Sequence, residues 1–276
     1  MKWPQVALLA ILCALSTPAR SSPTCELTAL PPDVTAKTFD MAVHLDQTLD
    51  AVFPRSDVVL LARGGQDLSR FGLTFSHLAF AVRVDGAPWK VLHELNRCRA
   101  DTSRIYQEGL ADFIGPTSVK ADVWVIVPNL DLQKALLPLL ANGSEAARRL
   151  HEPSYSAVAY PFDTQFQNSN QWVLEVLGAA MSSTKPSDLK RPTIQAWLKA
   201  QDYRPTSLHL TLAERIAART YVPHANVVDH PAGERVAGNY SVVTVDSVVN
   251  FLKQKNVVVA DFAIGRRGSD DVNTDD

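Results

Sequence analysis

The stretch FSHLAFAVRVDGAPWKVLHEL, residues 75–95, decides the fold class that this chain predicts. Its two halves, residues 75–84 and 89–95, are rich in aliphatic, aromatic and β-branched residues, which is typical of strands. Between them, Asp85-Gly86-Ala87-Pro88 is a strong turn signal. The stretch therefore predicts a β-hairpin of two antiparallel strands, with His77 inside the first strand.

Further strands and helices surround this hairpin along the chain. The continuous apolar run at 58–62 predicts a buried strand, and residues 121–127 and 240–245 predict two more. Apolar residues at helical spacing predict helices at 36–52, 104–114, 130–140, 168–181, 193–200 and 212–219. Because strands are interspersed with helices after a first helix, we expect an α+β fold with packed helices and a mostly antiparallel sheet.

Composition excludes several classes of protein. The chain has 276 residues and is 46% hydrophobic, which fits a globular protein with a sizeable core. Its net charge of -2 offers no clustered excess of Lys and Arg, so no nucleic-acid partner is expected. None of the seven His residues pairs with another at helical i, i+4 spacing, and no C-x-x-C is present. The sequence therefore indicates neither a metal site nor a cofactor.

The first 21 residues are typical of a signal peptide. Lys2 supplies a positive charge, Val6–Leu15 is an apolar run, and small residues follow in the stretch STPARSS. Cleavage after Ala19 or after Ser21 fits these small residues, and an uncleaved anchor is the alternative. No later stretch approaches the roughly 18 apolar residues of a spanning helix. We expect an exported protein, periplasmic or secreted, without a stable membrane span after cleavage.

Cleavage changes the number of cysteines in the mature chain. Cys13 leaves with the signal peptide, and Cys25 and Cys98 remain. In an oxidising compartment two remaining cysteines more often pair than stay reduced, so a Cys25–Cys98 disulfide is expected, with two buried thiols as the alternative. The acidic C-terminal residues 263–276 predict a disordered tail.

Two stretches carry residues suited to chemistry. In the first, His77 lies inside an apolar strand, where most histidines are structural. In the second, QNSNQWVL at 167–174, a polar cluster that includes Ser169 opens an amphipathic helix. Asn and Ser are favoured at helix starts as caps, but this cluster exceeds what capping needs.

Together the stretches SHLAF and NSNQWV resemble the permuted papain-like pattern of lecithin:retinol acyltransferase relatives and bacterial cell-wall amidases, in which the histidine strand precedes the nucleophile helix. The resemblance implies a papain-like core at 22–185 and a packed C-terminal extension of helices and strands at 186–262. It also implies that His77 is the base. Ser169 stands where that pattern has cysteine, and a serine hydroxyl does not ionise at a helix start. Ser169 is therefore either a serine nucleophile that uses His77 or the mark of a site that has lost catalysis.

The chain as a whole resembles a more specific family, exported bacterial proteins grouped as domain of unknown function 2145. The stretches that carry this resemblance are GQDLSRFGLTFSHLAF, VLHELNRC, YPFDTQFQNSNQWVLEVL and VTVDSVVNFL. It implies an exported protein and assigns no activity.

Strand parity limits which residue orients His77. Side chains alternate between faces of a strand. If the turn has four residues, His77 lies opposite Asn96; if it has three, His77 lies opposite Leu95 and shares a face with His93. Pro88 cannot donate to the ladder and favours the longer turn, but an imidazole can both accept from and orient another. We favour His93 slightly and keep Asn96 as a near-equal alternative.

Two functions follow from these residues. In the first, Ser169 attacks an amide or ester, His77 is the general base, and His93 or Asn96 orients it. In the second, the same cleft of a non-catalytic exported module binds a peptide, lipid or envelope glycan. Gln66, Asn168 and Asn170 are the expected substrate-binding residues in either case. A Ser169 Oγ to His77 nitrogen distance above roughly 5 Å would favour binding over chemistry.

Overall fold

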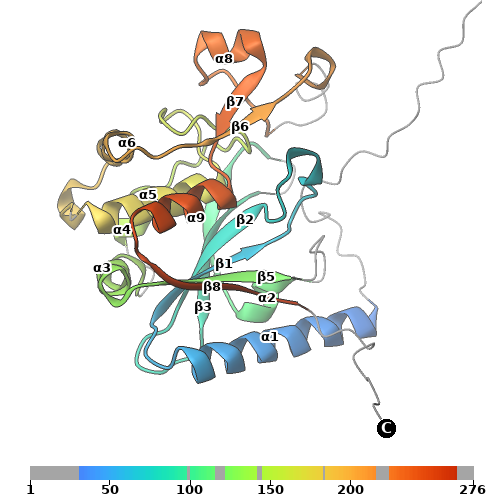
Figure 1. Ribbon diagram of the computed structural model, residues 1–276, viewed down its shortest axis with the longest axis vertical. Helices are drawn as coiled ribbons and strands as arrows, with labels where there is room; N and C mark the ends of the chain where they lie inside the picture. Colours follow the sequence, from blue (N-terminus) through green and yellow to red (C-terminus); the bar gives the residue numbers. More distant parts are fainter. Residues whose placement is uncertain are drawn as a thin grey trace, which may run out of the picture.

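A central sheet of six strands organises the protein in the computed structural model, which describes residues 31–97, 100–115, 122–141, 145–182, 184–215 and 224–265. The strands lie in the order β4-β3-β2-β1-β5-β8, and every neighbouring pair is antiparallel (Figure 1). Their bounds are β1 Val58–Arg63, β2 His77–Val82, β3 Lys90–Asn96, β4 Ser103–Glu108, β5 Val123–Pro128 and β8 Val258–Ile264. The predicted α+β fold with a mostly antiparallel sheet is confirmed.

Helices cover both faces of the sheet, because side chains along each central strand alternate between two apolar cores. Leu61 and Ala79 belong to the core under α1 (Pro32–Val52) and α2 (Leu110–Ile114). Leu60 and Phe80 belong to the core on the opposite face. The helices that contribute to this second core are α3 Leu130–Leu140, α4 Glu145–Arg148, α5 Ser169–Met181, α6 Arg191–Ala200 and α9 Val245–Gln254. The central strands are therefore buried on both sides, which explains their continuous apolar runs.

Helix α5 is the element that carries Ser169. Its N-cap Asn168 accepts a hydrogen bond from the backbone N–H of Gln171 at 2.8 Å, which begins the helix at Ser169. Twelve of its 13 residues are buried, among them Trp172, whose ring lies edge-on to Phe80 with centroids 5.8 Å apart. The helix is therefore fixed against the sheet along nearly its whole length.

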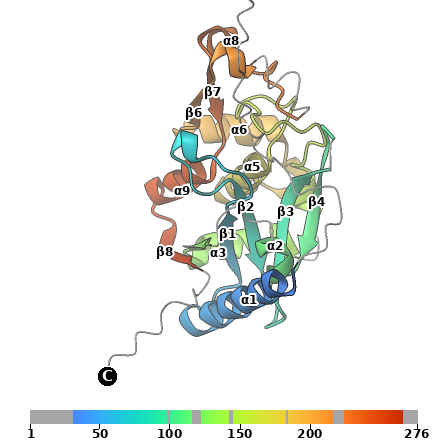
Figure 2. The same ribbon diagram turned by 90° about the vertical axis from the view of Figure 1, so that its right-hand side faces the viewer.

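A second, smaller unit projects from one end of the molecule, at the top in Figures 1 and 2. It contains strands β6 (Thr206–His209) and β7 (Asn239–Val242), which pair antiparallel, and helix α8 (Ala232–Ala237). Leu208 and Tyr240 on these strands form a small apolar cluster with Leu73, which precedes β2. Part of the C-terminal region thus packs against the segment that leads into the histidine strand.

Three expectations about the elements are wrong. Residues 104–114 form strand β4 followed by the short helix α2 rather than one helix. This edge strand exposes polar side chains such as Arg104 and Gln107, so its sequence lacks a period-2 pattern. The strand expected at 240–245 ends at Val242, and Thr244 caps helix α9. Strand β8 includes residues 263 and 264, which were assigned to the disordered tail.

Other expectations fall partly or wholly outside the described residues. These are the signal peptide at 1–21, the disulfide between Cys25 and Cys98, and residues 266–276 of the tail. The expected helix at 212–219 is helical over residues 212–215, beyond which the description stops until residue 224. In the described parts of the chain, no helix has the length and apolar character needed to cross a membrane.

Candidate active site

Ser169 and His77 meet where the first turn of α5 reaches the beginning of β2. The distance from Ser169 Oγ to His77 Nδ1 is 3.1 Å, below the roughly 5 Å above which binding would be favoured over chemistry. Both side chains are buried, at 7% relative exposure each. Two residues 92 positions apart in sequence thus form a hydrogen-bonded pair of hydroxyl and imidazole.

Asn170 fixes this arrangement by joining the helix to the strand. Its Oδ1 accepts from the backbone N–H of Leu78 at 2.9 Å, and its Nδ2 donates to the carbonyl oxygens of Ser76 at 3.2 Å and Val243 at 3.3 Å. The contacts to Ser76 and Leu78 flank His77. Asn170 is predicted to bind substrate, and its amide also bonds to backbone on both sides of the histidine.

His93 lies on the other side of the His77 ring. The distance from His77 Nε2 to His93 Nδ1 is 2.8 Å, and His93 is fully buried. The hairpin pairs Phe80 with Leu92, which is the register of the three-residue alternative and puts both histidines on one face. Asn96, the other candidate, pairs with Ser103 of β4 in the sheet.

Glu108 extends this chain of contacts and was missed by sequence reasoning. The distance from its Oε1 to His93 Nε2 is 3.0 Å, and its side chain is 24% exposed. The residue closes β4, the strand that was misread as a helix, and strand pairing with β3 sets it near His93. Glu108 could have been found from the sequence only if residues 103–108 had been recognised as a strand that pairs with β3.

The four side chains allow one consistent set of proton positions, assigned from the acceptors rather than observed. If the Ser169 hydroxyl donates to His77 Nδ1, then His77 Nε2–H donates to His93 Nδ1. His93 Nε2 then carries a proton and lies 3.0 Å from Glu108 Oε1, at ion-pair distance but without the geometry of a hydrogen bond. Both imidazoles are neutral in this arrangement, and a positive charge formed on either lies along a path to a carboxylate.

Electrostatics keep His77 neutral. Burial lowers the pKa of His77 well below 6.5, and the neighbouring His93 and the positive charge of Arg63 act in the same direction. Arg63 is the partner of His77 in the pairing of β1 with β2. The ring of Phe113 packs against both imidazoles, with centroids 6.0 Å from His77 and 5.6 Å from His93. At neutral pH, His77 can therefore accept a proton.

A pocket of about 280 Å³ opens beside Ser169. Its lining includes all of the expected site residues except His93, namely Gln66, His77, Asn96, Asn168, Ser169 and Asn170. Gln66 donates its backbone N–H to Ser76 Oγ at 2.9 Å, which holds the loop before β2 over the pocket. The Nδ2 of Asn168 donates to the carbonyl oxygen of Val243 at 3.4 Å. Asn168 therefore both caps helix α5 and bonds to the backbone at Val243.

Tyr155 is a second residue that the sequence did not reveal. It lines the pocket and is 8% exposed. Burial raises the pKa of the Tyr155 phenol, as does the charge of Glu94, while hydrogen bonding to Ser169 acts in the opposite direction. The phenol therefore stays protonated beside the serine, where it is a hydrogen-bond donor.

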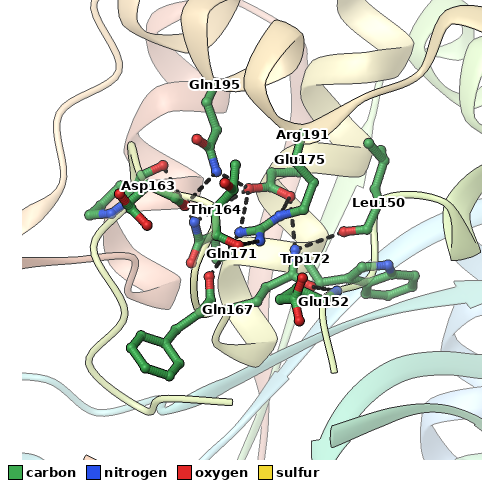
Figure 3. A network of polar contacts seen from close by, with 12 residues as sticks. Leu150, Glu152, Asp163, Thr164, Gln167, Gln171, Trp172, Glu175, Arg191 and Gln195 are labelled. Carbon is green, nitrogen blue, oxygen red and sulfur yellow. Dashed lines mark hydrogen bonds and ion pairs between the residues drawn. The ribbon is translucent and has the colours of Figure 1, made fainter. Parts of the chain in front are cut away.

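A buried polar network holds the segment that precedes Ser169 (Figure 3). At its centre, Arg191 Nε donates to Glu175 Oε2 at 2.8 Å. The same guanidinium donates to the carbonyl oxygens of Thr164 at 2.9 Å and Phe166 at 3.0 Å. Gln167 Nε2 also donates to Glu175 Oε2, at 2.8 Å. The network ties the loop before α5 to the body of α5 and to α6, so it positions the helix start.

Comparison with known proteins supplies a family and no activity. A search of curated proteins and a search of solved structures found no match for the chain. Residues 53–252 match the family model described as "Uncharacterized protein conserved in bacteria (DUF2145)". This region is more than half of the chain and contains Ser169, His77, His93 and Glu108. The chain therefore belongs to the DUF2145 family of uncharacterized proteins conserved in bacteria.

Proposed function

We propose that the protein is a hydrolase or acyltransferase that cleaves an amide or ester with Ser169 as nucleophile. One observation carries the proposal: Ser169 Oγ lies 3.1 Å from Nδ1 of His77, whose Nε2 lies 2.8 Å from His93. A nucleophile, a base and a group that orients the base are the parts that nucleophilic catalysis needs.

In the first half of the reaction, Ser169 Oγ attacks the carbonyl carbon while its proton moves to His77 Nδ1. The carbonyl oxygen gains the negative charge. The backbone N–H groups of Ser169 and Asn170, at the start of α5, and the Tyr155 hydroxyl are the donors available to it. The tetrahedral intermediate collapses when protonated His77 gives its proton to the leaving amine or alcohol, which leaves an acyl group on Ser169.

In the second half, water attacks the acyl carbon and His77 again takes the proton, so that acid and free serine are released. In an acyltransferase, the hydroxyl or amine of an acceptor replaces water. His93 and Glu108 stabilise the imidazolium that forms transiently, because His93 faces the Nε2–H of His77 and the Glu108 carboxylate lies beside His93.

The use of serine fits the surroundings of the site. A serine hydroxyl keeps its proton until attack, so it needs a neutral base in direct contact. His77 provides that base, because its pKa is lowered by burial. The order of a histidine strand before a nucleophile helix supports a permuted papain-like core, which forms part of the same proposal.

Serine in the position where the resembled pattern has cysteine is the observation that favours a second function, a non-catalytic module that binds a peptide, lipid or envelope glycan in the same pocket. A covalent probe separates the two. We expect a fluorophosphonate to label wild-type protein at Ser169 and to leave Ser169→Ala and His77→Ala unlabelled, with the adduct mapped by mass spectrometry. Ser187→Ala, at an exposed serine that does not line the pocket, is the matched control.

Turnover gives the second readout. Against a panel of esters and amides, Ser169→Ala is expected to lower kcat by about 10³-fold or more. If the wild-type protein neither takes up the probe nor hydrolyses any member of the panel while Ser187→Ala behaves identically, the binding module is the correct function.

We further propose that the protein acts outside the cytoplasm. The signal-like residues 1–21 support export to the periplasm or medium, and a Cys25–Cys98 bridge belongs to the same proposal. N-terminal sequencing of the mature protein should begin at residue 20 or 22. Thiol titration of the unfolded mature chain should find two thiols only after reduction; two thiols without reductant would exclude the bridge.

A further inference from the structure

The pocket beside Ser169 has an apolar wall that the proposed reaction does not use. Leu208 of β6 and Tyr240 and Val242 of β7 form one side of it. Phe71 and Phe75, from the segment between β1 and β2, add to this lining. A ligand that fills the pocket would place an apolar body against these side chains, which favours binding by burial of apolar surface.

Glu94 is the unexplained group in this pocket. It lies on β3, lines the same pocket as Ser169 and is fully buried. Neither of its carboxyl oxygens has a hydrogen-bond partner within the described parts of the chain. Leaving a buried carboxyl without partners costs free energy, and the proposed mechanism gives it no role.

The polar groups around Glu94 are committed elsewhere. The hydroxyl of Ser103 donates to the carbonyl oxygen of Glu152 at 3.3 Å, so it offsets the burial of the carboxyl only in part. The guanidinium of Arg191, which acts on Glu94 through space, is paired with Glu175 at 2.8 Å. The protein therefore surrounds this carboxyl without neutralising it.

The charges that face Glu94 set its protonation. Burial is the largest effect and raises the pKa of Glu94 to about 8, helped by the negative charges of Glu175 and Glu152 and opposed by Ser103 and Arg191. Its own charge in turn raises the pKa of Tyr155, the phenol beside Ser169. A cationic ligand would favour the ionised form of Glu94 and relieve the cost of its burial.

We propose that Glu94 binds a primary ammonium group of the substrate, so that the pocket selects compounds with an apolar body and a cationic amine. An ammonium offers three N–H donors and a positive charge to two acceptor oxygens that have no partner. Peptides with an unblocked amino group belong to this class. The inference deepens the proposed function, on which it rests for the reaction but not for the binding.

The test compares two probes of equal shape, hexylamine and 1-hexanol, by isothermal titration calorimetry. At pH 9, we expect wild-type protein to bind hexylamine at least about tenfold more tightly than hexanol, the difference that a charged hydrogen bond produces. Glu94→Gln should bind both probes alike. Glu145→Gln, which alters a carboxylate with 88% side-chain exposure, should keep the wild-type preference. Equal binding of the probes to wild-type protein, or an amine preference that persists in Glu94→Gln, would overturn the proposal.

A second experiment, the pH dependence of binding to wild-type protein, tests the proposal even if Glu94→Gln does not fold. Hexylamine stays protonated from pH 6.5 to 9, since alkyl ammonium groups such as that of lysine lose their proton only near a pKa of about 10.4. Its affinity should rise across this range as Glu94 ionises, while that of hexanol stays constant. A constant ratio between the two probes would contradict the role of Glu94.

These outcomes are separable from those of the proposed reaction. Amine binding that depends on Glu94, without hydrolysis of any ester or amide, would leave the subsite standing and remove the proposed activity. Hydrolysis with equal kcat/KM for amine-bearing and neutral esters would do the reverse.

Discussion

Glu108 shows how a partly exposed residue acts on a buried serine. It is separated from Ser169 by two imidazoles, yet each contact along Ser169, His77, His93 and Glu108 is 3.1 Å or shorter. In the proposed mechanism its carboxylate is a positioning group, which lowers the energy of a positive charge on the histidine pair.

Glu108→Gln tests this role at the level of one charge. Glutamine keeps the size and shape of the side chain but carries no charge. We expect kcat to fall about 10- to 100-fold with KM unchanged, because the charge matters only when an imidazole is protonated. The acid limb of the pH–rate profile should also move to lower pH. A merely structural residue would leave that profile where it was, and Glu145→Gln serves as the exposed control.

The lowered pKa of His77 makes a prediction about the pH dependence of activity. Burial, then His93, then Arg63 hold this pKa well below 6.5, so the ring stays a neutral base as pH falls through 6.5. The value of kcat/KM should stay constant from pH 7.5 to 6.5 and decline only at lower pH.

Substitution of a neighbouring charge checks the cause of this shift. Arg63→Gln removes one of the positive charges that disfavour protonation, so its acid limb should lie at higher pH than that of the wild type. If the acid limb of the wild type has its midpoint at or above pH 6.5, or if this midpoint is unchanged in Arg63→Gln, then burial and Arg63 do not lower the pKa of His77 as described.

The sequence revealed the site only as far as local patterns reach. Ser169 and His77 were found from a polar helix start and a histidine in a strand, and parity reduced the orienting residue to His93 or Asn96. The register that separates these two depends on how the whole hairpin packs. Glu108 and Tyr155 enter the site through strand pairing and a loop, which no local spacing encodes.

At the scale of elements, helices α5 and α6 approach closely at Gly178. A Cβ built on Gly178 would lie 2.8 Å from Ile194 Cγ2 and 3.3 Å from Leu198. Gly178→Ala should therefore destabilise the fold by about 1–3 kcal/mol through overpacking, although alanine is the better helix former. Chemical denaturation measures this change.

Gly233 in α8 provides the matched control. A Cβ there would meet no atom within 4 Å, so Gly233→Ala should leave stability unchanged or raise it by up to about 1 kcal/mol. In the double variant Gly178→Ala/Ile194→Ala, the loss should be smaller than the sum of the two single losses, because alanine at 194 removes the clash. Additive losses would show that the two helices do not meet as described.

The elements that were misread share a physical cause. Strand β4 is an edge strand in which Arg104, Gln107 and other polar residues face solvent, so its sequence has helical rather than alternating character. Helix α9 begins directly after β7, and its apolar residues at 245, 248, 249 and 252 gave a helical signal that the preceding strand masked. Residues 258–264 form a half-exposed strand whose partner, β5, lies more than 100 residues earlier.

At the scale of the whole molecule, the site depends on segments that are distant in sequence. Ser169 comes from a helix on one face of the sheet, whereas His77 and His93 share the opposite face with Phe113 of α2. The two meet only at the end of the sheet, where residues of the projecting β6–β7 unit line the pocket. Both layers must therefore be complete for the serine and the histidines to be in contact.

The family match leaves out two elements that complete these layers. The matched residues 53–252 exclude helix α1 and strand β8. Met41, Leu45 and Leu49 of α1 are at most 3% exposed and fill the core beneath the histidine face. Strand β8 covers the edge of β5, which would otherwise present an unpaired apolar strand.

We therefore expect the fragment 53–252 to fail to unfold cooperatively and to aggregate, whereas the fragment 31–265 should unfold in one transition. The reason is one of magnitude: each buried leucine of α1 contributes about 2–5 kcal/mol, and a whole domain has only about 5–15 kcal/mol of stability. In the full chain, Leu45→Ala should lower the free energy of unfolding by that amount. Val43→Ala, at a residue 53% exposed on the same helix, should change it by less than about 0.5 kcal/mol. A fragment 53–252 with the same Tm as 31–265 would show that α1 and β8 are accessory to the core.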